Sequence, residues 1–279
     1  MRIARVTKDG KIGLAAKSGE KVTIAFGESL ADIDAHLAAG TLAEAGAKAA
    51  AGEAVDEASL TFLPPVVRPS KIICLGLNYR DHAEESGLGI PEFPVLFGRF
   101  PSSLIGHGAP IILPKVSSQL DWEAELVVVL AKGGKNIAES DALDHVAAYS
   151  VFNDASIRDY QLRTPQWTAG KNFDDTGAFG PWLVTPDEVP AGGAGLKIEC
   201  RVNGQVMQSS NTSNLIFNTA TTIALLSTFM TLEAGDVLVM GTPGGVGLAR
   251  NPPVWMKDGD ICEVEIEGVG LLSNPIVAE

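Results

Sequence analysis

The sequence predicts a mixed, β-rich α+β fold in which a small N-terminal α+β domain precedes a larger domain. After residue 70 the chain consists of short β-branched runs interrupted by Gly, Pro, Asn and Asp, which is typical of strands joined by turns. Few segments carry apolar residues at helical spacing. Prolines interrupt residues 63–70 and make this segment the linker. We therefore expect one domain at residues 1–66 and a second at residues 67–279.

The N-terminal domain is expected to begin with a hairpin. Residues 2–7 and 11–16 have the pattern of strands, and the Asp-Gly pair between them is a tight-turn signal. Residues 29–37 carry apolar side chains at helical spacing, with Ser29 at the N-cap position, so we expect a short amphipathic helix. Residues 41–58 are rich in Ala, Gly and Glu and have weak periodicity, which leaves open a second helix or a pliable connection.

The larger domain is expected to be dominated by strands. The predicted strands are residues 71–76, 110–113, 123–130, 149–154, 196–202, 237–240 and 262–266. Helical spacing marks residues 140–148 and 213–229 as the clear helix candidates. No segment repeats at a fixed period, which disfavours a solenoid or a propeller.

Charge and hydropathy exclude several classes of partner. The chain has 279 residues, a formal net charge of -13 and a sequence pI near 4.7, with its acidic residues spread along its length. Such a chain repels phosphate backbones and anionic lipid unless a basic patch overrides the repulsion, and no run of Lys and Arg supplies one. No continuous apolar segment has the length of a signal-peptide core or of a membrane span. We expect a cytoplasmic protein that binds neither nucleic acid nor membrane.

The cysteines carry no signal of a disulfide or a zinc site. Cys74, Cys200 and Cys262 are odd in number, far apart and set in apolar, strand-like runs, so we expect reduced core residues. The His and Cys residues are too scattered for the spacing that zinc sites require.

Three acidic residues form a candidate metal site. Glu123 and Glu125 are two residues apart in a predicted strand, so both carboxylates project from one face. Such a pair persists when a cation neutralises it, when one carboxyl keeps its proton, or when both carboxylates lie in water. Asp154 follows another apolar run, where a strand is expected to end, and could complete an oxygen-only site for Mg²⁺ or Mn²⁺. An exposed acidic strand start is the alternative.

A second group of polar residues follows Asp154. The guanidinium fork of Arg158 and the amide of Gln161 suit recognition of a carboxylate or keto oxygen beside a metal. Lys171, between Gly and Asn, could place a positive charge near an anionic intermediate. Arg158 and Lys171 could instead be surface ion-pair partners.

His82 and Glu85 form a candidate general base. They are three residues apart, so one helical turn would place them on one face, where the carboxylate can orient the imidazole and raise its basicity. That arrangement is required to draw a proton from water. Gly87 and Gly89 would allow this element to swing as a lid.

A glycine-rich turn at residues 240–247 follows a predicted strand. It lacks the Lys-Ser/Thr ending of a nucleotide P-loop and the glycine spacing of the dinucleotide fingerprint. Its backbone N–H groups and the Thr242 hydroxyl could bind an acid group, and a simple tight turn is the alternative.

Taken together and in this order, these segments resemble the fumarylacetoacetate hydrolase superfamily. The segments that carry the resemblance are GLNYRDHAEE, DWEAELVVVL, NDASIRDYQ, GKNFDDTGAFGPW, RVNGQVMQSSNTSNLIF and GTPGGVG. The resemblance covers residues 71–279, and the N-terminal part resembles the small, variable domain that many members carry.

The resemblance implies a β-roll or sandwich catalytic domain around a buried site, and a homodimer. It implies Mg²⁺, Mn²⁺ or Ca²⁺ at Glu123, Glu125 and Asp154, with His82 and Glu85 activating water. The positions expected to contact substrate are Tyr79, Arg99, Arg158, Gln161, Lys171 and Thr242, with Lys171 also stabilising charge during catalysis.

Two departures from the superfamily pattern concern the substrate. Arg99 stands where many members have Lys, and His107 stands where Pro is frequent. We expect Arg99, His107 and Trp167 to lie near the pocket that selects the far end of the substrate.

The leading functional hypothesis is hydrolysis of a carbon–carbon bond in a 2,4-dioxo acid of the acylpyruvate or 2,4-diketo-3-deoxy sugar acid type. The alternative keeps the metal site but changes the reaction to oxaloacetate decarboxylation, or to isomerisation or dehydration of a related 2-oxo acid. A third hypothesis is a catalytically silent binding or scaffold protein with the same fold.

Overall fold

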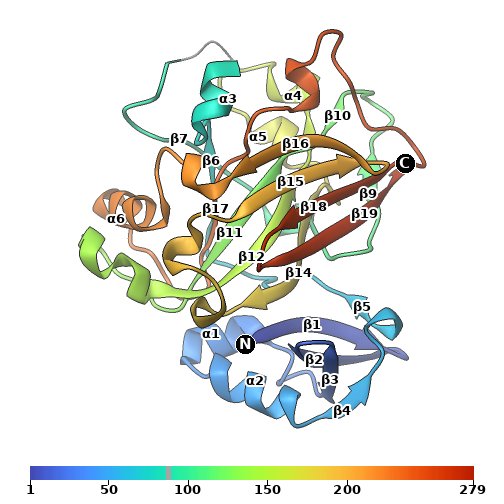
Figure 1. Ribbon diagram of the computed structural model, residues 1–279, viewed down its shortest axis with the longest axis vertical. Helices are drawn as coiled ribbons and strands as arrows, with labels where there is room; N and C mark the ends of the chain where they lie inside the picture. Colours follow the sequence, from blue (N-terminus) through green and yellow to red (C-terminus); the bar gives the residue numbers. More distant parts are fainter. Residues whose placement is uncertain (86–88) are drawn as a thin grey trace.

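One large sheet joins the N-terminal strands to the rest of the chain. The computed structural model describes residues 1–85 and 89–279 (Figure 1). The strands of the large sheet follow the order β4 (Glu53–Val55), β3 (Lys21–Phe26), β2 (Lys11–Ser18), β1 (Arg2–Lys8), β14 (Gly177–Val184), β12 (Val146–Asp154), β11 (Ala124–Leu130), β17 (Val237–Val239), β6 (Ile72–Gly76) and β7 (Val95–Gly98). Two short strands join this path, β5 (Thr61–Phe62) on β1 and β8 (Leu104–Ile105) on β14. Pairing of β1 with β14 makes the sheet continuous.

A second sheet packs on the later part of the first. Its order is β16 (Gln205–Asn211), β15 (Lys197–Val202), β18 (Ile261–Ile266), β19 (Gly270–Ala278) and β9 (Ile111–Leu113), and a short ladder pairs β10 (Leu120–Asp121) with β13 (Ser156–Ile157). This arrangement confirms the mixed, β-rich fold. The division at residues 1–66 and 67–279 stays a prediction.

The core fills both faces of the large sheet. Along β11, Leu126 and Val128 belong to one buried cluster, which also holds Ile198 of β15. The alternate residue Val127 belongs to a second buried cluster, together with Ile33 at the start of the first helix. Because side chains alternate across a strand, a strand that is apolar throughout is covered on both faces.

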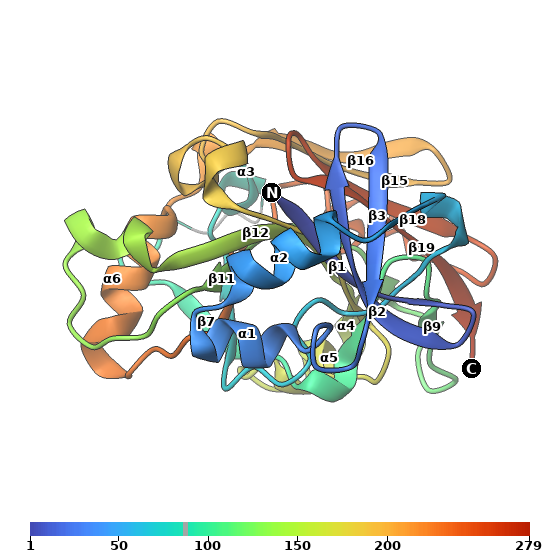
Figure 2. The same cartoon turned by 90° about the horizontal axis from the view of Figure 1, so that it is seen from below.

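The helices are short. They are α1 (Ile33–Ala39), α2 (Leu42–Ala50), α3 (Arg80–Glu85), α4 (Arg158–Gln161), α5 (Thr168–Lys171) and α6 (Thr219–Phe229), and the 3-10 helices are Glu57–Ser59, Pro101–Ser103, Glu139–His145, Pro186–Glu188, Ala191–Gly193, Thr212–Asn214 and Gly247–Ala249. Helix α2 packs on strands β2 and β3, and Figure 2 shows α1 beside it.

Several element predictions are confirmed and others are wrong at their ends. The hairpin of β1 and β2 is confirmed. The first helix starts at Ile33 because the Asp32 carboxylate, not Ser29, accepts the backbone N–H of Ala35. The helix expected over 140–148 is a 3-10 helix that gives way to β12 at Val146.

The last expected helix, over 213–229, begins later than predicted. Asn218 caps α6 by accepting the N–H of Thr221, so the preceding residues stay outside the helix. Residues 41–58, which the sequence left open, hold α2, β4 and a 3-10 helix.

The three cysteines are buried, as their apolar sequence contexts predict. Cys74, Cys200 and Cys262 are buried and free. In the part of the chain that the structure describes, no helix combines the length and apolar character that crossing a membrane requires.

Candidate active site

The three acidic residues of the predicted metal site meet where β11 begins and β12 ends. The two strands are antiparallel, with Ala124 opposite Asn153, so the chain ends that carry the acids lie side by side. Carboxylate oxygens of Glu123, Glu125 and Asp154 lie within 4.8 Å of one another. Their exposed fractions are 6%, 1% and 0%, so the alternative in which the glutamates lie in water is wrong.

Buried cations surround two of the three carboxylates. The Lys171 ammonium donates to Glu123 Oε2 at 2.5 Å and to Asp154 Oδ2 at 2.6 Å. Arg158 Nη1 pairs with Glu123 Oε1 at 2.7 Å, and Arg99 Nε pairs with Asp154 Oδ1. Arg158 and Lys171 are buried, so neither is a surface ion-pair partner.

Glu125 differs from its two neighbours in its electrostatic environment. Its Oε2 accepts the backbone N–H of Gly241 at 2.5 Å. Burial and the charges of Asp154 and Glu123 raise its pKa well above the usual range, and Lys171 opposes this only in part. For Asp154, burial acts in the same upward direction, but Lys171 and Arg99 outweigh it and lower the pKa to about 2.

These properties fit a divalent metal. The donor set is oxygen-only, which suits Mg²⁺, Mn²⁺ or Ca²⁺. Lys171 compensates the charge of an ionised Glu125 carboxylate only in part. A bound cation would supply the missing positive charge. The triad can therefore hold a divalent cation.

A cavity of about 320 Å³ opens onto Glu123 and Glu125 of the triad. Its lining includes Glu123, Glu125, Lys171, Arg158, Gln161, Thr242, His82 and Glu85, together with apolar side chains. Within the described residues, Arg158 Nη2 is a buried donor without a hydrogen-bond partner. Because an unpartnered buried donor is costly, this nitrogen is poised to bind a ligand oxygen.

Helix α3 brings His82 and Glu85 to this cavity. His82 Nδ1 lies 3.5 Å from Glu85 Oε2, and the Gly245 N–H donates to both Glu85 oxygens at 3.1 and 3.0 Å. Asp81 fixes the helix by accepting from the Ser210 hydroxyl at 2.5 Å. The expected lid motion rests partly on Gly87, which lies outside the described residues.

Two buried residues that sequence reasoning missed hold the site together. Asp121 accepts Arg158 Nε at 2.8 Å and also the N–H groups of Trp122, Gly247 and Leu248, at 2.8, 2.7 and 2.9 Å. It therefore joins the glycine-rich turn to the guanidinium that faces the cavity. Its position two residues before Glu123 was a usable signal.

Gln208 plays a similar part for Thr242. Its Nε2 donates to Thr242 Oγ1 and to Pro243 O, both at 2.8 Å, while its Oε1 accepts the Ala124 N–H at 2.9 Å. Nothing in the spacing of the β16 segment singles out this glutamine.

Two residues expected to contact substrate do not line the cavity. Arg99 donates to Asp154, to Thr176 Oγ1 at 3.3 Å and to Ala155 O at 2.6 Å, and it is absent from the cavity lining. We expect Arg99 to hold Asp154 in place rather than to touch substrate. Tyr79 is fully buried and also outside the lining, so its contact with substrate stays a prediction.

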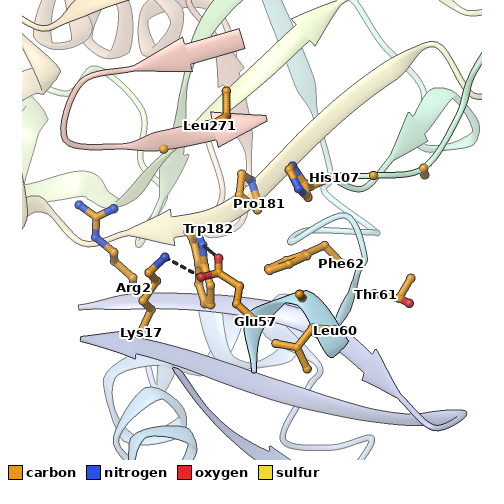
Figure 3. A pocket seen from close by; sticks show the side chains of 14 residues that line it. Arg2, Lys17, Glu57, Leu60, Thr61, Phe62, His107, Pro181, Trp182 and Leu271 are labelled. Carbon is orange, nitrogen blue, oxygen red and sulfur yellow. Dashed lines mark hydrogen bonds and ion pairs between the residues drawn. The ribbon is translucent and has the colours of Figure 1, made fainter. Parts of the chain in front are cut away.

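His107 lies elsewhere, and the expectation that it borders this pocket is wrong. It lines a separate hollow of about 620 Å³ between the N-terminal strands and β14 (Figure 3). Its ring packs edge-on against Phe62, which packs edge-on against Trp182. Trp167, by contrast, does line the cavity above the triad.

The family profile described as "Fumarylacetoacetate (FAA) hydrolase C-terminal" matches residues 71–277. The chain belongs to the fumarylacetoacetate hydrolase family. Members of this family are enzymes, and they generally use divalent metals.

Relatives of known name share this family. "Oxaloacetate tautomerase Fahd2a, mitochondrial" of Rattus norvegicus is 47% identical over 224 residues, which span 80% of this chain and 71% of the relative. The Homo sapiens protein of the same name, FAHD2A, is 47% identical over 220 residues, 78% and 70% of the two chains. These animal relatives are named as mitochondrial, and the cytoplasmic location expected for this chain stays a prediction.

Solved structures of family members match the whole chain. A putative HpcE protein from Mycobacterium smegmatis superposes with a TM-score of 0.85 at 37% identity, covering 100% of this chain and 99% of its own. A fumarylacetoacetate hydrolase from psychrophilic Exiguobacterium antarcticum superposes with a TM-score of 0.88 at 32% identity, covering 100% of both chains.

Removing the Asp121 carboxylate should destabilise this member of the fumarylacetoacetate hydrolase family strongly. Asp121→Ala leaves backbone donors and the Arg158 guanidinium short of a buried acceptor, so we expect a loss of about 3–5 kcal/mol in the free energy of unfolding. Urea unfolding followed by circular dichroism measures it. The exposed Asp187→Ala is the control and should change stability by less than about 0.5 kcal/mol. A loss for Asp121→Ala as small as that of the control contradicts the structural role.

The two glutamates should respond to neutralisation with opposite signs. A carboxyl whose pKa rises on folding contributes most to stability below its unfolded pKa, and the contribution is lost as the pH rises through the folded pKa. At about pH 8 with chelator present, Glu125→Gln should therefore raise the urea midpoint. Glu123→Gln should lower it, because Arg158 and Lys171 lose their partner.

Metal addition completes this comparison. Mn²⁺ or Mg²⁺ should raise the midpoint of the unsubstituted protein and raise those of both variants much less. If Glu125→Gln and Glu123→Gln lowered the urea midpoint equally in chelator, the charge on Glu125 would be compensated in the folded protein, and the prediction would be wrong.

Proposed function

We propose that this chain catalyses the metal-assisted keto–enol tautomerisation of a small 2-oxo acid, with oxaloacetate as the first substrate to test. One observation carries the proposal: a single cavity contains both a candidate base and a group that can stabilise negative charge on oxygen, here called the floor of the cavity. Glu123, Glu125 and Lys171 lie on the floor, whereas His82 and Glu85 come from α3. Enolisation requires both parts, one to stabilise negative charge on oxygen and one to move a proton at carbon. The names of the relatives, oxaloacetate tautomerases, support the same reaction.

When bound by Glu123, Glu125 and Asp154, a divalent cation supplies Lewis acidity toward the oxygens of a 2-oxo acid. Mg²⁺ or Mn²⁺ suits this role best, and Ca²⁺ shares the preference for oxygen ligands.

The side chains around the cation site orient the substrate. Arg158 Nη2 is a buried donor without a partner in the described part of the chain, and it can bind a substrate carboxylate. Thr242 Oγ1 accepts from Gln208, so the hydroxyl hydrogen is left to donate toward the cavity. The oxygen of Gln161 accepts from Arg158 Nη1 at 2.8 Å, which leaves its amide hydrogens for substrate.

The proton moves through the residues of α3. The His82–Glu85 pair takes a proton from C3 of the substrate, and a proton is delivered to the oxygen at C2, so the C3–H bond breaks and an O–H bond forms without a co-reactant. The neighbouring ammonium of Lys171 stabilises the charge that develops on that oxygen. General base catalysis of this kind contributes about 10²–10⁴-fold in rate.

The decay of enol-oxaloacetate absorbance tests the proposal. We expect the purified protein to accelerate the decay with Mg²⁺ or Mn²⁺ present and to lose the activity in chelator. Asp154→Asn should abolish activity and metal binding together, whereas His82→Ala should lower kcat by about 10²–10⁴-fold and leave calorimetric metal binding intact. Undiminished tautomerisation after exhaustive chelation contradicts the mechanism, and accumulation of pyruvate would assign decarboxylation instead.

Hydrolysis of an acylpyruvate is the second candidate, and the position of the His82–Glu85 pair favours it. The pair lies beside a cavity that also holds Lys171, so it could deprotonate a water that attacks the C4 carbonyl while Lys171 offsets the oxyanion. Names of solved neighbours, among them "maleylpyruvate hydrolase" from Sphingobium, include this reaction class.

Isotope labelling separates the two candidates. Incubation of the protein with acetylpyruvate in ¹⁸O water should give no labelled acetate if tautomerisation is the activity. Mass spectrometry that finds one solvent oxygen in newly formed acetate would assign hydrolysis, since only hydrolysis adds water across the cleaved bond.

A further inference from the structure

The cavity above the triad has two chemically different halves. One half holds the carboxylates with Lys171, Arg158, Gln161 and Thr242. The lining also includes the apolar side chains of Leu77, Phe97, Leu162, Trp167, Val246 and Leu248, here called the apolar half, which meets the polar half where the Lys171 ammonium lies 4.9 Å from the centre of the Phe97 ring. A cavity with this polarity binds a ligand that is itself polar at one end and apolar at the other.

Trp167 is the best-fixed aromatic side chain of the apolar half. Its ring lies against Gly76 so closely that a Cβ at position 76 would come within 2.2 Å of Trp167 Cζ3. The ring of Phe97 packs on it, with centroids 5.6 Å apart at an interplanar angle of 60°. The indole therefore packs against the paired strands β6 and β7.

The same short helix positions the indole and the ammonium. Trp167 is the N-cap residue of α5, and Lys171 is the last residue of that helix. Residues four apart on a helix face the same side about one turn from each other. The indole and the ammonium therefore border the same space, in which a substrate beside Lys171 would lie.

Charge restricts what the apolar half can accept. None of its six side chains can neutralise a carboxylate, and Glu85 adds a further carboxylate to the lining of the cavity. Among the described residues, the donors left for substrate are Arg158 Nη2, the Gln161 amide and the Thr242 hydroxyl, and all three belong to the polar half. A second carboxylate that reached into the apolar half would lose its hydration without gaining a counter-ion.

We propose that the apolar half binds an aryl or branched alkyl group on C3 of a monocarboxylic 2-oxo acid. On this basis the protein enolises arylpyruvates as well as oxaloacetate, whose two carboxylates are close enough together to remain in the polar half. It discriminates against longer dicarboxylates such as 2-oxoglutarate. This inference rests on the proposed enolisation and adds the substrate class.

Deuterium exchange at C3 in D₂O, followed by proton NMR, measures enolisation for every candidate substrate. With Mn²⁺ or Mg²⁺ added and buffer rates subtracted, we expect kcat/KM for phenylpyruvate to exceed that for 2-oxoglutarate by about 10-fold or more. Oxaloacetate serves as the reference for the proposed function.

Two substitutions of Trp167 test the role of the indole, one by an expected loss of activity and the other by an expected gain. Trp167→Ala should lower the ratio of phenylpyruvate to oxaloacetate exchange by about 10-fold, because the aromatic contact is lost. Trp167→Arg should raise exchange of 2-oxoglutarate by about 10-fold, a gain that misfolding cannot produce. Phe26→Ala, at an exposed aromatic of β3 outside this cavity, is the matched control and should leave all three rates unchanged.

The outcomes distinguish the two proposals. Absence of exchange on both oxaloacetate and phenylpyruvate overturns the proposed function and this inference with it. Exchange on oxaloacetate combined with equal efficiency on phenylpyruvate and 2-oxoglutarate, or with no response to either Trp167 substitution, overturns the inference alone.

Discussion

The arrangement of the site depends on a buried cluster of charges that is one cation short. In the described structure, Asp121, Glu123, Glu125 and Asp154 face Arg99, Arg158 and Lys171. Burial of an unpaired ion costs several kcal/mol, so the pairs must be held in good geometry to exist at all. Glu125 is the acid left over, and its raised pKa is the sign of that imbalance. A site for an additional cation follows from the charge count rather than from any single residue.

This constraint explains why distant segments converge. The charged side chains come from β10, the residue before β11, β11 itself, β12, α4, α5 and the residue after β7. Most of them pair with another member of the cluster. Asn78 ties the segment before α3 to the same frame by donating to Met240 O at 2.7 Å and to Phe217 O at 3.0 Å. The candidate base on α3 is thereby connected to the strand that leads into the glycine-rich turn. The positions of floor and base are set by one hydrogen-bonded network.

Local sequence patterns predicted the three acidic residues, whereas long-range contacts determine the roles of the other site residues. Alternation along the predicted strand 123–130 placed Glu123 and Glu125 on one face, although β11 itself begins at Ala124, and the end of an apolar run placed Asp154. Spacing could single out Asp121, but the roles of Asp121 and Gln208 depend on partners more than thirty residues away, Gly247 and Thr242, and no local pattern reveals those partners. The expectation for His107 was wrong for the same reason, because the ring of Phe62 that it contacts comes from the N-terminal strands. The helix expected over 140–148 failed because β12 pairs with both β11 and β14, and sheet pairing overrides local spacing.

The pairing of β1 with β14 has a consequence for any shortened form of this protein. Strand β14 lies between β1 and β12, and Arg2 and Ile3 cover its end at Val184 and Leu183. Without residues 1–66, that end would present open N–H and C=O groups along an apolar strand, the kind of edge through which sheets of separate molecules join and aggregate. The N-terminal strands thus cover an aggregation-prone edge of β14, and the next strand in the sheet, β12, carries Asp154.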